Sequence, residues 1–208
     1  MPDSRNPSRR RDEGRRVELI EAATRVIAKE GIAAATIRRI AEEAGVPGSL
    51  VHYWFADKDE LLQEVLAADL NPIQNAVTTV TEAGDGLLEQ LRAAFRVIEQ
   101  DDRGRQITPY EMTTWALRKP EIAHLAREQY ASYRQFGTES MSAWVAATNA
   151  RLPAETPVAG QLIAALFDGL VLAWLADPEN TDVDAVLRLA CDLMAPFAPE
   201  SPDSPGTS

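Results

Sequence analysis

Hydrophobic residues recur at helical spacing along most of the chain. Between Arg15 and Glu30 the apolar positions lie three and four residues apart, and Gly31 supplies a C-terminal stop. A shorter pattern of the same kind follows Thr36, which can cap a helix, and ends at Gly45. The sequence contains neither strand-like alternation nor internal repeats. These patterns predict an all-α protein.

A third helix is expected after the bend at residues 46–48. Val51 and Phe55 lie one turn apart and should bury against the first two helices, whereas the neighbouring side chains face outward: Ser49, His52 and Tyr53. Two short helices across a tight glycine-containing turn are typical of a helix-turn-helix, whose second helix enters the major groove of DNA. The alternative is a generic helical hairpin with an incidental surface tyrosine.

Charge is distributed unevenly along the chain. The net charge is −11, but residues 1–62 hold 11 Lys/Arg and 11 Asp/Glu, so the whole excess of acid falls on residues 63–208. Five of the basic residues lie between Arg5 and Arg15. We expect residues 1–14 to form a basic disordered arm that neutralises DNA phosphates, with a merely solvated tail as the alternative. Lys58, in the first turn of a fourth helix capped by Asp57, also favours a phosphate.

The segment TIRRIAEEAGVPGSLVHYWFADKDEL joins a threonine-led helix, an AGV turn, a short aromatic helix ending in phenylalanine, and a lysine soon after it. In these features residues 15–62 resemble the DNA-binding domain of the TetR family of bacterial transcriptional regulators. The resemblance implies which positions face bases and phosphates: Thr36, Arg38, Gly48, Ser49, His52, Tyr53 and Lys58.

The rest of the chain is divided by glycine- and proline-containing breaks. The breaks predict further helices at residues 86–101, 106–118, 121–149, 158–176 and 182–196. Asn71-Pro72 is a predicted hinge, because proline removes a backbone donor. We expect residues 63–197 to form a helical effector-binding and dimerisation domain, and the proline- and serine-rich residues 198–208 to be disordered.

The C-terminal part resembles the TetR subgroup that contains the betaine-pathway regulator, through EMTTWALRKPEIAHLAREQYASYR and LIAALFDGLVLAWLADPENTDVDAVL. The resemblance implies that the last two long helices pair with those of a second subunit, and that the preceding helices enclose a small-molecule pocket. Independently, the 158–176 helix is apolar around most of its circumference and needs more cover than one amphipathic neighbour provides. We therefore expect a homodimer.

Candidates for the effector pocket are aromatic and acidic residues of these helices. Glu111 and Trp115 lie one turn apart, and a tryptophan beside a carboxylate suits a cationic ligand. Further candidates are Tyr110, Trp144 and Asp168. Ordinary core aromatics with a solvated glutamate are the alternative, and Asp168 can equally be a capped or interface-paired aspartate.

The sequence carries no P-loop, GxGxxG, GxSxG or HExxH motif and no cluster of Cys and His. We therefore expect no catalytic residues, metal or cofactor. The single Cys191 suits a reducing compartment, and no apolar segment follows the basic start, so we expect a cytoplasmic protein. Asp168 within the apolar 158–176 run argues for a buried helix and against a membrane span.

The expected function is that of a ligand-responsive transcriptional regulator. It would bind a palindromic double-stranded operator as a homodimer, repress transcription and be released by a small organic effector. The alternative is a helical small-molecule-binding protein or an enzyme without any DNA function.

Overall fold

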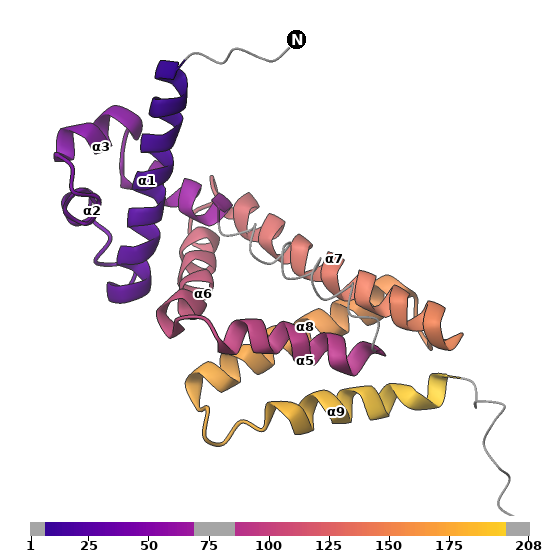
Figure 1. Cartoon of the computed structure of the whole chain (residues 1–208). Coiled ribbons are helices and arrows are strands. Elements are labelled where there is room, and N and C mark those ends of the chain that lie inside the picture. The colour runs from indigo at the N-terminus through magenta and orange to yellow at the C-terminus, as the bar shows by residue number, and fades with distance from the viewer. Residues whose placement is uncertain (1–6, 69–85, 199–208) are drawn as a thin grey trace, which may run out of the picture. The chain divides into compact units, whose positions relative to one another are not determined.

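The computed structural model describes residues 7–68 and 86–198, and within these two ranges every regular element is helical and no strand occurs (Figure 1). The expected all-α fold is confirmed. In chain order the helices are α1 (Pro7–Glu30), α2 (Ile37–Ala44), α3 (Gly48–Trp54), a helix over residues 58–68, α5 (Gly86–Glu99), α6 (Arg103–Leu117), α7 (Ala123–Thr148), α8 (Thr156–Ala176), α9 (Val183–Met194) and a short 3-10 turn (Ala195–Phe197).

Two helices begin three or more residues earlier than the sequence pattern predicts. Helix α1 begins at Pro7, within the segment expected to be disordered, because proline is tolerated in a first turn and the arginines that follow are good helix formers. Helix α6 begins at Arg103, because the Asp102 carboxylate accepts hydrogen bonds from the backbone N–H groups of Gly104 and Arg105 at 3.0 and 3.2 Å. The predicted hinge at Asn71-Pro72 and the predicted tail beyond residue 198 lie outside the described residues.

The chain divides into two compact units. The first unit comprises residues 1–71 with 101–128, and the second comprises residues 72–100 with 129–208. The sequence predicts a boundary near residue 62, with residues 63–197 in the effector-binding and dimerisation domain. In the structure, α6 and the beginning of α7 belong instead to the same unit as the helix-turn-helix.

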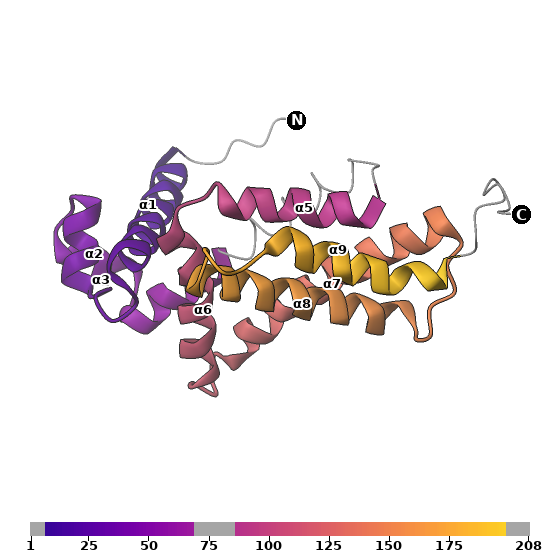
Figure 2. The same ribbon diagram turned by 90° about the horizontal axis from the view of Figure 1, so that it is seen from below.

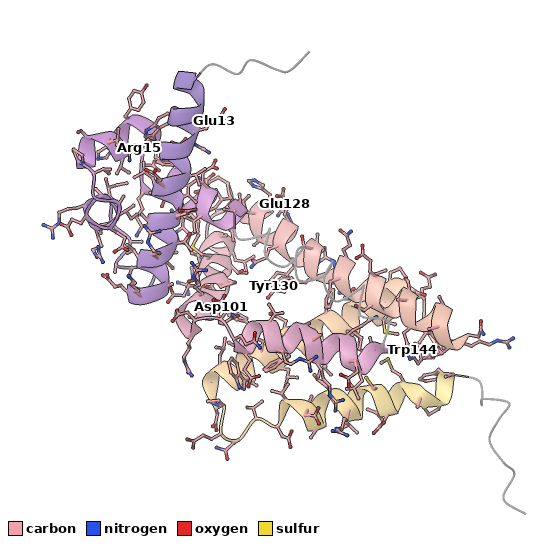
Figure 3. The ribbon with its side chains drawn as sticks, in the orientation of Figure 1. Glu13, Arg15, Asp101, Glu128, Tyr130 and Trp144 are labelled. Carbon is pink, nitrogen blue, oxygen red and sulfur yellow. The ribbon has the colours of Figure 1, made fainter. Side chains whose placement is uncertain are left out.

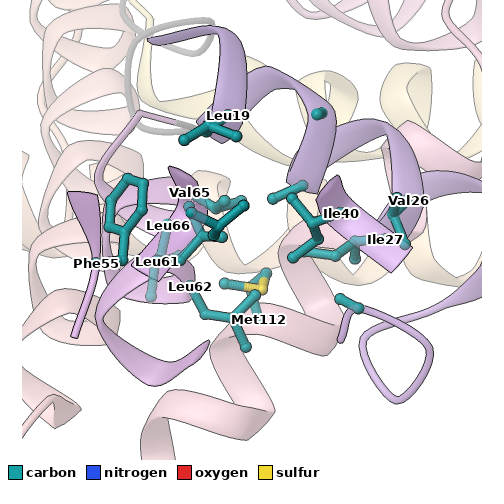
Figure 4. Close-up of a cluster of buried hydrophobic side chains, with 14 of the residues drawn as sticks. Leu19, Val26, Ile27, Ile40, Phe55, Leu61, Leu62, Val65, Leu66 and Met112 are labelled. Atoms are coloured by element: carbon teal, nitrogen blue, oxygen red, sulfur yellow. The ribbon is translucent and has the colours of Figure 1, made fainter. Parts of the chain in front are cut away.

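The core of the first unit combines side chains from distant parts of the sequence (Figure 4). Leu19 of α1, Ile40 of α2 and Phe55 after α3 are fully buried together with Leu61 of the 58–68 helix. Met112 of α6 lies in the same cluster and is also fully buried. Helix α6 is therefore part of the core that holds α2 and α3 in place.

The second unit contains α5, most of α7, α8 and α9 (Figure 2). Its core is a smaller set of buried side chains: Leu87, Leu91, Met141, Ile163, Leu170 and Leu187. Helices α7 and α8 cross closely at Gly137 and Gly160, where a Cβ on Gly137 would lie 2.0 Å from the Gly160 carbonyl oxygen. Larger residues at this crossing would push the two helices apart.

Helix α8 is long and apolar enough to cross a membrane by length and composition, and it is the one such helix in the described part of the chain. Ile163 and Leu170 of this helix are buried in the core of the second unit, however, and its Asp168 accepts a hydrogen bond from the Tyr130 hydroxyl. These contacts agree with a helix that packs against protein.

Candidate nucleic-acid interface and effector region

Side chains cap the first helix of the helix-turn-helix and the helix that follows the motif. The Thr36 hydroxyl accepts a hydrogen bond from the Arg39 backbone N–H at 3.2 Å and begins α2. The Asp57 carboxylate accepts one from the Glu60 N–H at 2.9 Å at the start of the 58–68 helix. Both predicted caps are confirmed. They fix where α2 and the 58–68 helix begin, on either side of α3.

Helix α3 separates its buried and exposed faces as its spacing predicts. Val51 is fully buried, and so is Phe55, the residue that ends the helix. The outward residues are exposed: Ser49, His52 and Tyr53. Tyr53 is 74% exposed. Its ring packs edge-on with that of Trp54 at a centroid distance of 5.0 Å, and this contact helps to hold the exposed side chain in its outward position. This face is free to meet base edges in a groove.

The adjacent arginines of α2 have different environments. The Arg38 side chain is 90% exposed and lies 3.6 Å from the Glu42 carboxylate one turn away. The Arg39 guanidinium instead binds Glu30 at 2.6 Å and Glu43 at 3.1 Å. Hydrogen bonds from Arg25 and then Arg39 lower the pKa of the Glu43 carboxyl. Arg39 is therefore held by the fold, whereas Arg38 is available to a phosphate.

The Lys58 side chain forms a hydrogen bond with the main chain of the α1–α2 turn. Its ammonium donates a hydrogen bond to the Ile32 carbonyl oxygen at 3.0 Å, and partial burial lowers the pKa of this group. An ammonium carries three donors, so this bond leaves protons for a phosphate. The lysine can serve the fold and the predicted phosphate contact at once.

The effector candidates are divided between the two units. Tyr110, Glu111 and Trp115 lie on α6, in the first unit. The Glu111 carboxylate accepts a hydrogen bond from the Ile32 backbone N–H at 2.7 Å. Trp115 packs against the core of the first unit, and the Lys119 ammonium lies 5.0 Å from the centroid of its ring. Contacts within the first unit therefore engage both Glu111 and Trp115.

The other two candidates, Trp144 and Asp168, belong to the second unit. Trp144 is labelled in Figure 3. Trp144 packs against the core of that unit. Asp168 of α8 accepts a hydrogen bond from the Tyr130 hydroxyl of α7 at 3.0 Å. Burial, and then the charge and hydrogen bond of Asp168, raise the pKa of Tyr130 to about 12. Asp168 is thus engaged in a hydrogen bond that joins α7 and α8.

Four aromatic rings cluster in the second unit, and one of them, Phe167, directly precedes Asp168 in the sequence. Phe95 meets Phe167 edge-on at 6.3 Å and Trp174 at 5.4 Å, and Phe136 meets Phe167 at 6.4 Å. The sequence pattern marked none of Phe95, Phe136 and Trp174 as a pocket residue, because helical spacing does not distinguish a ligand wall from core packing.

Helices α8 and α9 leave large apolar side chains exposed. On α8 these are Val158, Leu162 and Leu172, and on α9 they are Val186, Leu189 and Leu193. Leu162 and Leu193 are each 67% exposed. Along α8 the exposed positions 158, 162, 165, 169 and 172 follow steps of four and three residues, which place them on one face of the helix. Such a stripe is typical of a helix seam that lacks its partner.

Among the described residues no group of three or more His, Cys, Asp or Glu side chains is placed to hold a metal ion. Several acidic and basic side chains of the first unit form ion pairs, such as Arg25 with Glu43. The arrangement of α2, α3 and the exposed polar face of α3 defines a helix-turn-helix DNA-binding protein.

The chain belongs to the TetR family of bacterial regulatory proteins. Residues 19–65 match the family model "Bacterial regulatory proteins, tetR family", and residues 84–196 match the model "Tetracyclin repressor-like, C-terminal domain". The first match covers the helix-turn-helix, and the second covers α5 to α9. The family resemblance of both parts of the chain is therefore confirmed.

Curated relatives match along most of their length. The nicotine-responsive transcriptional repressor HdnoR of Paenarthrobacter nicotinovorans is 33% identical over 172 residues, which cover 80% of this chain and 86% of the relative. The transcriptional regulator BetI of Burkholderia pseudomallei (strain K96243) is 32% identical, with 88% of this chain and 94% of the relative covered.

Solved structures agree in fold. The multidrug binding protein EbrR, complexed with imidazole, has a TM-score of 0.65 at 25% identity, and the match covers 93% of this chain and 97% of the EbrR chain. The regulator SCO7518 of Streptomyces coelicolor A3(2) has a TM-score of 0.70 at 23% identity, with 86% and 98% covered. These likenesses extend across both units of the chain.

Proposed function

We propose that this TetR-family regulator is a cytoplasmic repressor, without catalytic activity, that binds a palindromic operator as a homodimer and is released by a small organic effector. The observation that carries the proposal is the exposed polar and aromatic face of α3, held behind by buried Val51 and Phe55. Ser49, His52 and Tyr53 would meet base edges, with Gly48 allowing close approach. Thr36, Arg38 and Lys58 would meet phosphates, aided by Arg9, Arg10 and Arg11 of α1.

Dimerisation is supported by the exposed apolar side chains Val158, Leu162 and Leu172 on α8, and Leu189 and Leu193 on α9. Burying such side chains between two copies would stabilise the pair by about 25 cal/mol for each Å² removed from water. Twofold symmetry then presents two copies of α3 to successive major grooves roughly 34–36 Å apart.

For the effector we favour the second unit around Asp168, whose carboxylate accepts a hydrogen bond from the Tyr130 hydroxyl, with Tyr130 packed edge-on against Tyr133 at 5.2 Å. Trp144 lies 14 residues from Tyr130 along α7, roughly 21 Å away, so it would not line the same site. Tyr110, Glu111 and Trp115 are left out because they lie on α6, in the unit that contains the helix-turn-helix. A carboxylate and aromatic rings favour an organic cation or an aromatic nitrogen compound. The names of two similar proteins support this class: one relative is nicotine-responsive, and EbrR was solved with imidazole.

Operator selection from a random DNA library, followed by titration of the purified chain, tests the DNA function. The proposal predicts enrichment of a palindrome and tight binding that weakens steeply with salt. A chain that enriches no sequence would favour the alternative, a helical small-molecule-binding protein or an enzyme without DNA function.

A thermal-shift panel of nicotine, imidazole, quaternary ammonium compounds and neutral aromatic compounds tests the effector class. A compound that raises the melting temperature should release the operator, and Asp168→Asn should weaken its binding while Asp192→Asn, an exposed change on α9, should not. A compound that strengthens operator binding would instead make the protein a corepressor-dependent regulator.

A further inference from the structure

Helix α6 is packed against α1 within the first unit. A Cβ on Gly104 would lie 1.9 Å from the Ala28 carbonyl oxygen, so the two backbones approach each other as closely as a glycine allows. Met112 and Ala116 of α6 are fully buried in the cluster that also contains Val51 and Phe55. Helix α6 therefore has direct packing contact with the elements that set the position of α3.

Glu111 of α6 holds the turn between α1 and α2. Its carboxylate accepts the backbone N–H of Ile32 at 2.7 Å. The preceding residue, Gly31, has a φ of 81°, and a Cβ there would lie 3.4 Å from a Glu111 carboxylate oxygen. Hydrogen bonds from a backbone N–H to a carboxylate are stronger than those to a neutral acceptor. This side chain therefore fixes the path by which the chain leaves α1.

The carbonyl group of Ile32 is also hydrogen-bonded. The Ile32 carbonyl accepts a hydrogen bond from the Lys58 ammonium at 3.0 Å, and Lys58 begins the 58–68 helix. Lys119, which follows α6, pairs with Asp59 of that helix. The N–H group of Ile32 thus links the α1–α2 turn to α6, and its carbonyl group links the turn to the 58–68 helix. Four residues after Ile32, Thr36 caps α2.

We propose that Glu111 is a positioning residue for operator recognition, which acts through Ile32 to fix the start of α2 and hence the placement of α3. The inference rests on the proposed DNA-binding function. A turn that is already ordered loses less conformational freedom when DNA binds, so the bond to Ile32 raises operator affinity without any contact between Glu111 and DNA.

Three variants of the full-length chain test the proposal: Glu111→Ala, Glu111→Gln and the matched control Glu121→Ala, which removes an exposed glutamate of the same unit. Amide hydrogen exchange of residues 31–36 and affinity for the selected operator are measured for each. Glu111→Ala should speed exchange in this segment and weaken operator binding about 10-fold, the equivalent of one charge-assisted hydrogen bond. Glu111→Gln keeps an acceptor oxygen and should restore affinity to within about 3-fold.

Exchange and affinity in Glu111→Ala that equal those of Glu121→Ala would overturn the proposal. Equal losses in Glu111→Ala and Glu111→Gln would also overturn it, because rescue by the amide oxygen is what a bond to Ile32 requires. If Glu111→Ala does not fold, Glu111→Asp takes its place, since the shorter side chain withdraws the carboxylate from Ile32. Exchange is measured without DNA, so it decides the Ile32 contact even if the wild-type chain proves to bind no operator.

Discussion

The two units of this protein differ in how completely they cover their own apolar residues. In the first unit, α1, α2, α3, the 58–68 helix and α6 together bury a large cluster that includes Phe55, Ile40 and Met112. The second unit has a smaller buried cluster and leaves Leu162 and Leu193 largely exposed. The first unit therefore leaves a solvated polar face on α3, whereas the second leaves apolar surface that, in the proposed homodimer, a second copy of the chain would cover.

The largest expected effect comes from placing charge on the exposed apolar face of the second unit. Leu162→Glu combined with Leu193→Glu should give monomers. In the proposed interface each chain would bury two new carboxylates close to those of its partner, and buried like charges without partners are strongly destabilising. Loss of the second half-site contact should then weaken operator binding by at least about 100-fold. Sedimentation and operator titration measure the two effects, and circular dichroism checks that the helices remain.

The matched control is Leu117→Glu, which charges a leucine of α6 that is 62% exposed in the first unit. It should leave the dimer unchanged. A double variant that remains dimeric would show that α8 and α9 are not the interface.

A smaller effect should distinguish base readers from phosphate contacts within the first unit. Tyr53→Ala should change the ranking of operator variants by about 1–3 kcal/mol at the base pairs it contacts. Arg38→Ala should weaken all sites alike and reduce the salt slope by up to roughly one unit. A randomised operator library measured at several salt concentrations separates these outcomes. If both variants lost affinity uniformly, the assignment of roles would be wrong.

Lys58 requires a separate comparison because its ammonium also bonds the Ile32 carbonyl. Lys58→Ala should reduce affinity for all operators and also lower the free energy of unfolding, whereas Arg38→Ala should leave stability nearly unchanged. Urea titration of both variants provides the check. Equal stability in the two variants would mean that the Ile32 bond contributes nothing measurable.

The smallest expected effect concerns the Tyr130–Asp168 hydrogen bond in the second unit. Tyr130 has its pKa raised to about 12, above the ordinary tyrosine value of about 10 in an unfolded chain. Its contribution to stability is therefore complete below pH 10 and is lost as the pH rises toward 12. Tyr130→Phe should flatten the alkaline fall of the free energy of unfolding, whereas Tyr53→Phe, at an exposed position, should not. An unchanged alkaline profile in Tyr130→Phe would contradict the assignment.

The sequence was sufficient for the parts of the protein that short-range patterns determine. Helix caps at Thr36 and Asp57, and the buried and outward residues of α3, follow from spacing within a few residues. The position of α6 does not follow from such spacing, because Glu111 and Ile32 are 79 residues apart in the chain. Glu111 and Trp115 share a helix face, and only the three-dimensional contacts indicate that this face meets the core of the first unit.

Helix α1 also extends further into the basic start of the chain than its composition predicts. This composition suggested a disordered arm, but helix α1 extends back to Pro7 and includes Arg9, Arg10 and Arg11. The high charge of this segment argues against a helix that forms on its own. A run of helix-forming residues can nevertheless extend a helix whose later turns are already held by packing against the core. A phosphate contact from this segment would then come from a helix end.

The central claim is that two copies of the chain bind one palindromic operator through α3. The most direct measurement is the mass of the protein–DNA complex on the selected operator, compared with an operator in which about 5 base pairs, half a helical turn, separate the half-sites further. We predict two chains on the natural spacing and a large loss of affinity on the altered one. A single chain per site, or equal affinity for both spacings, would contradict the account.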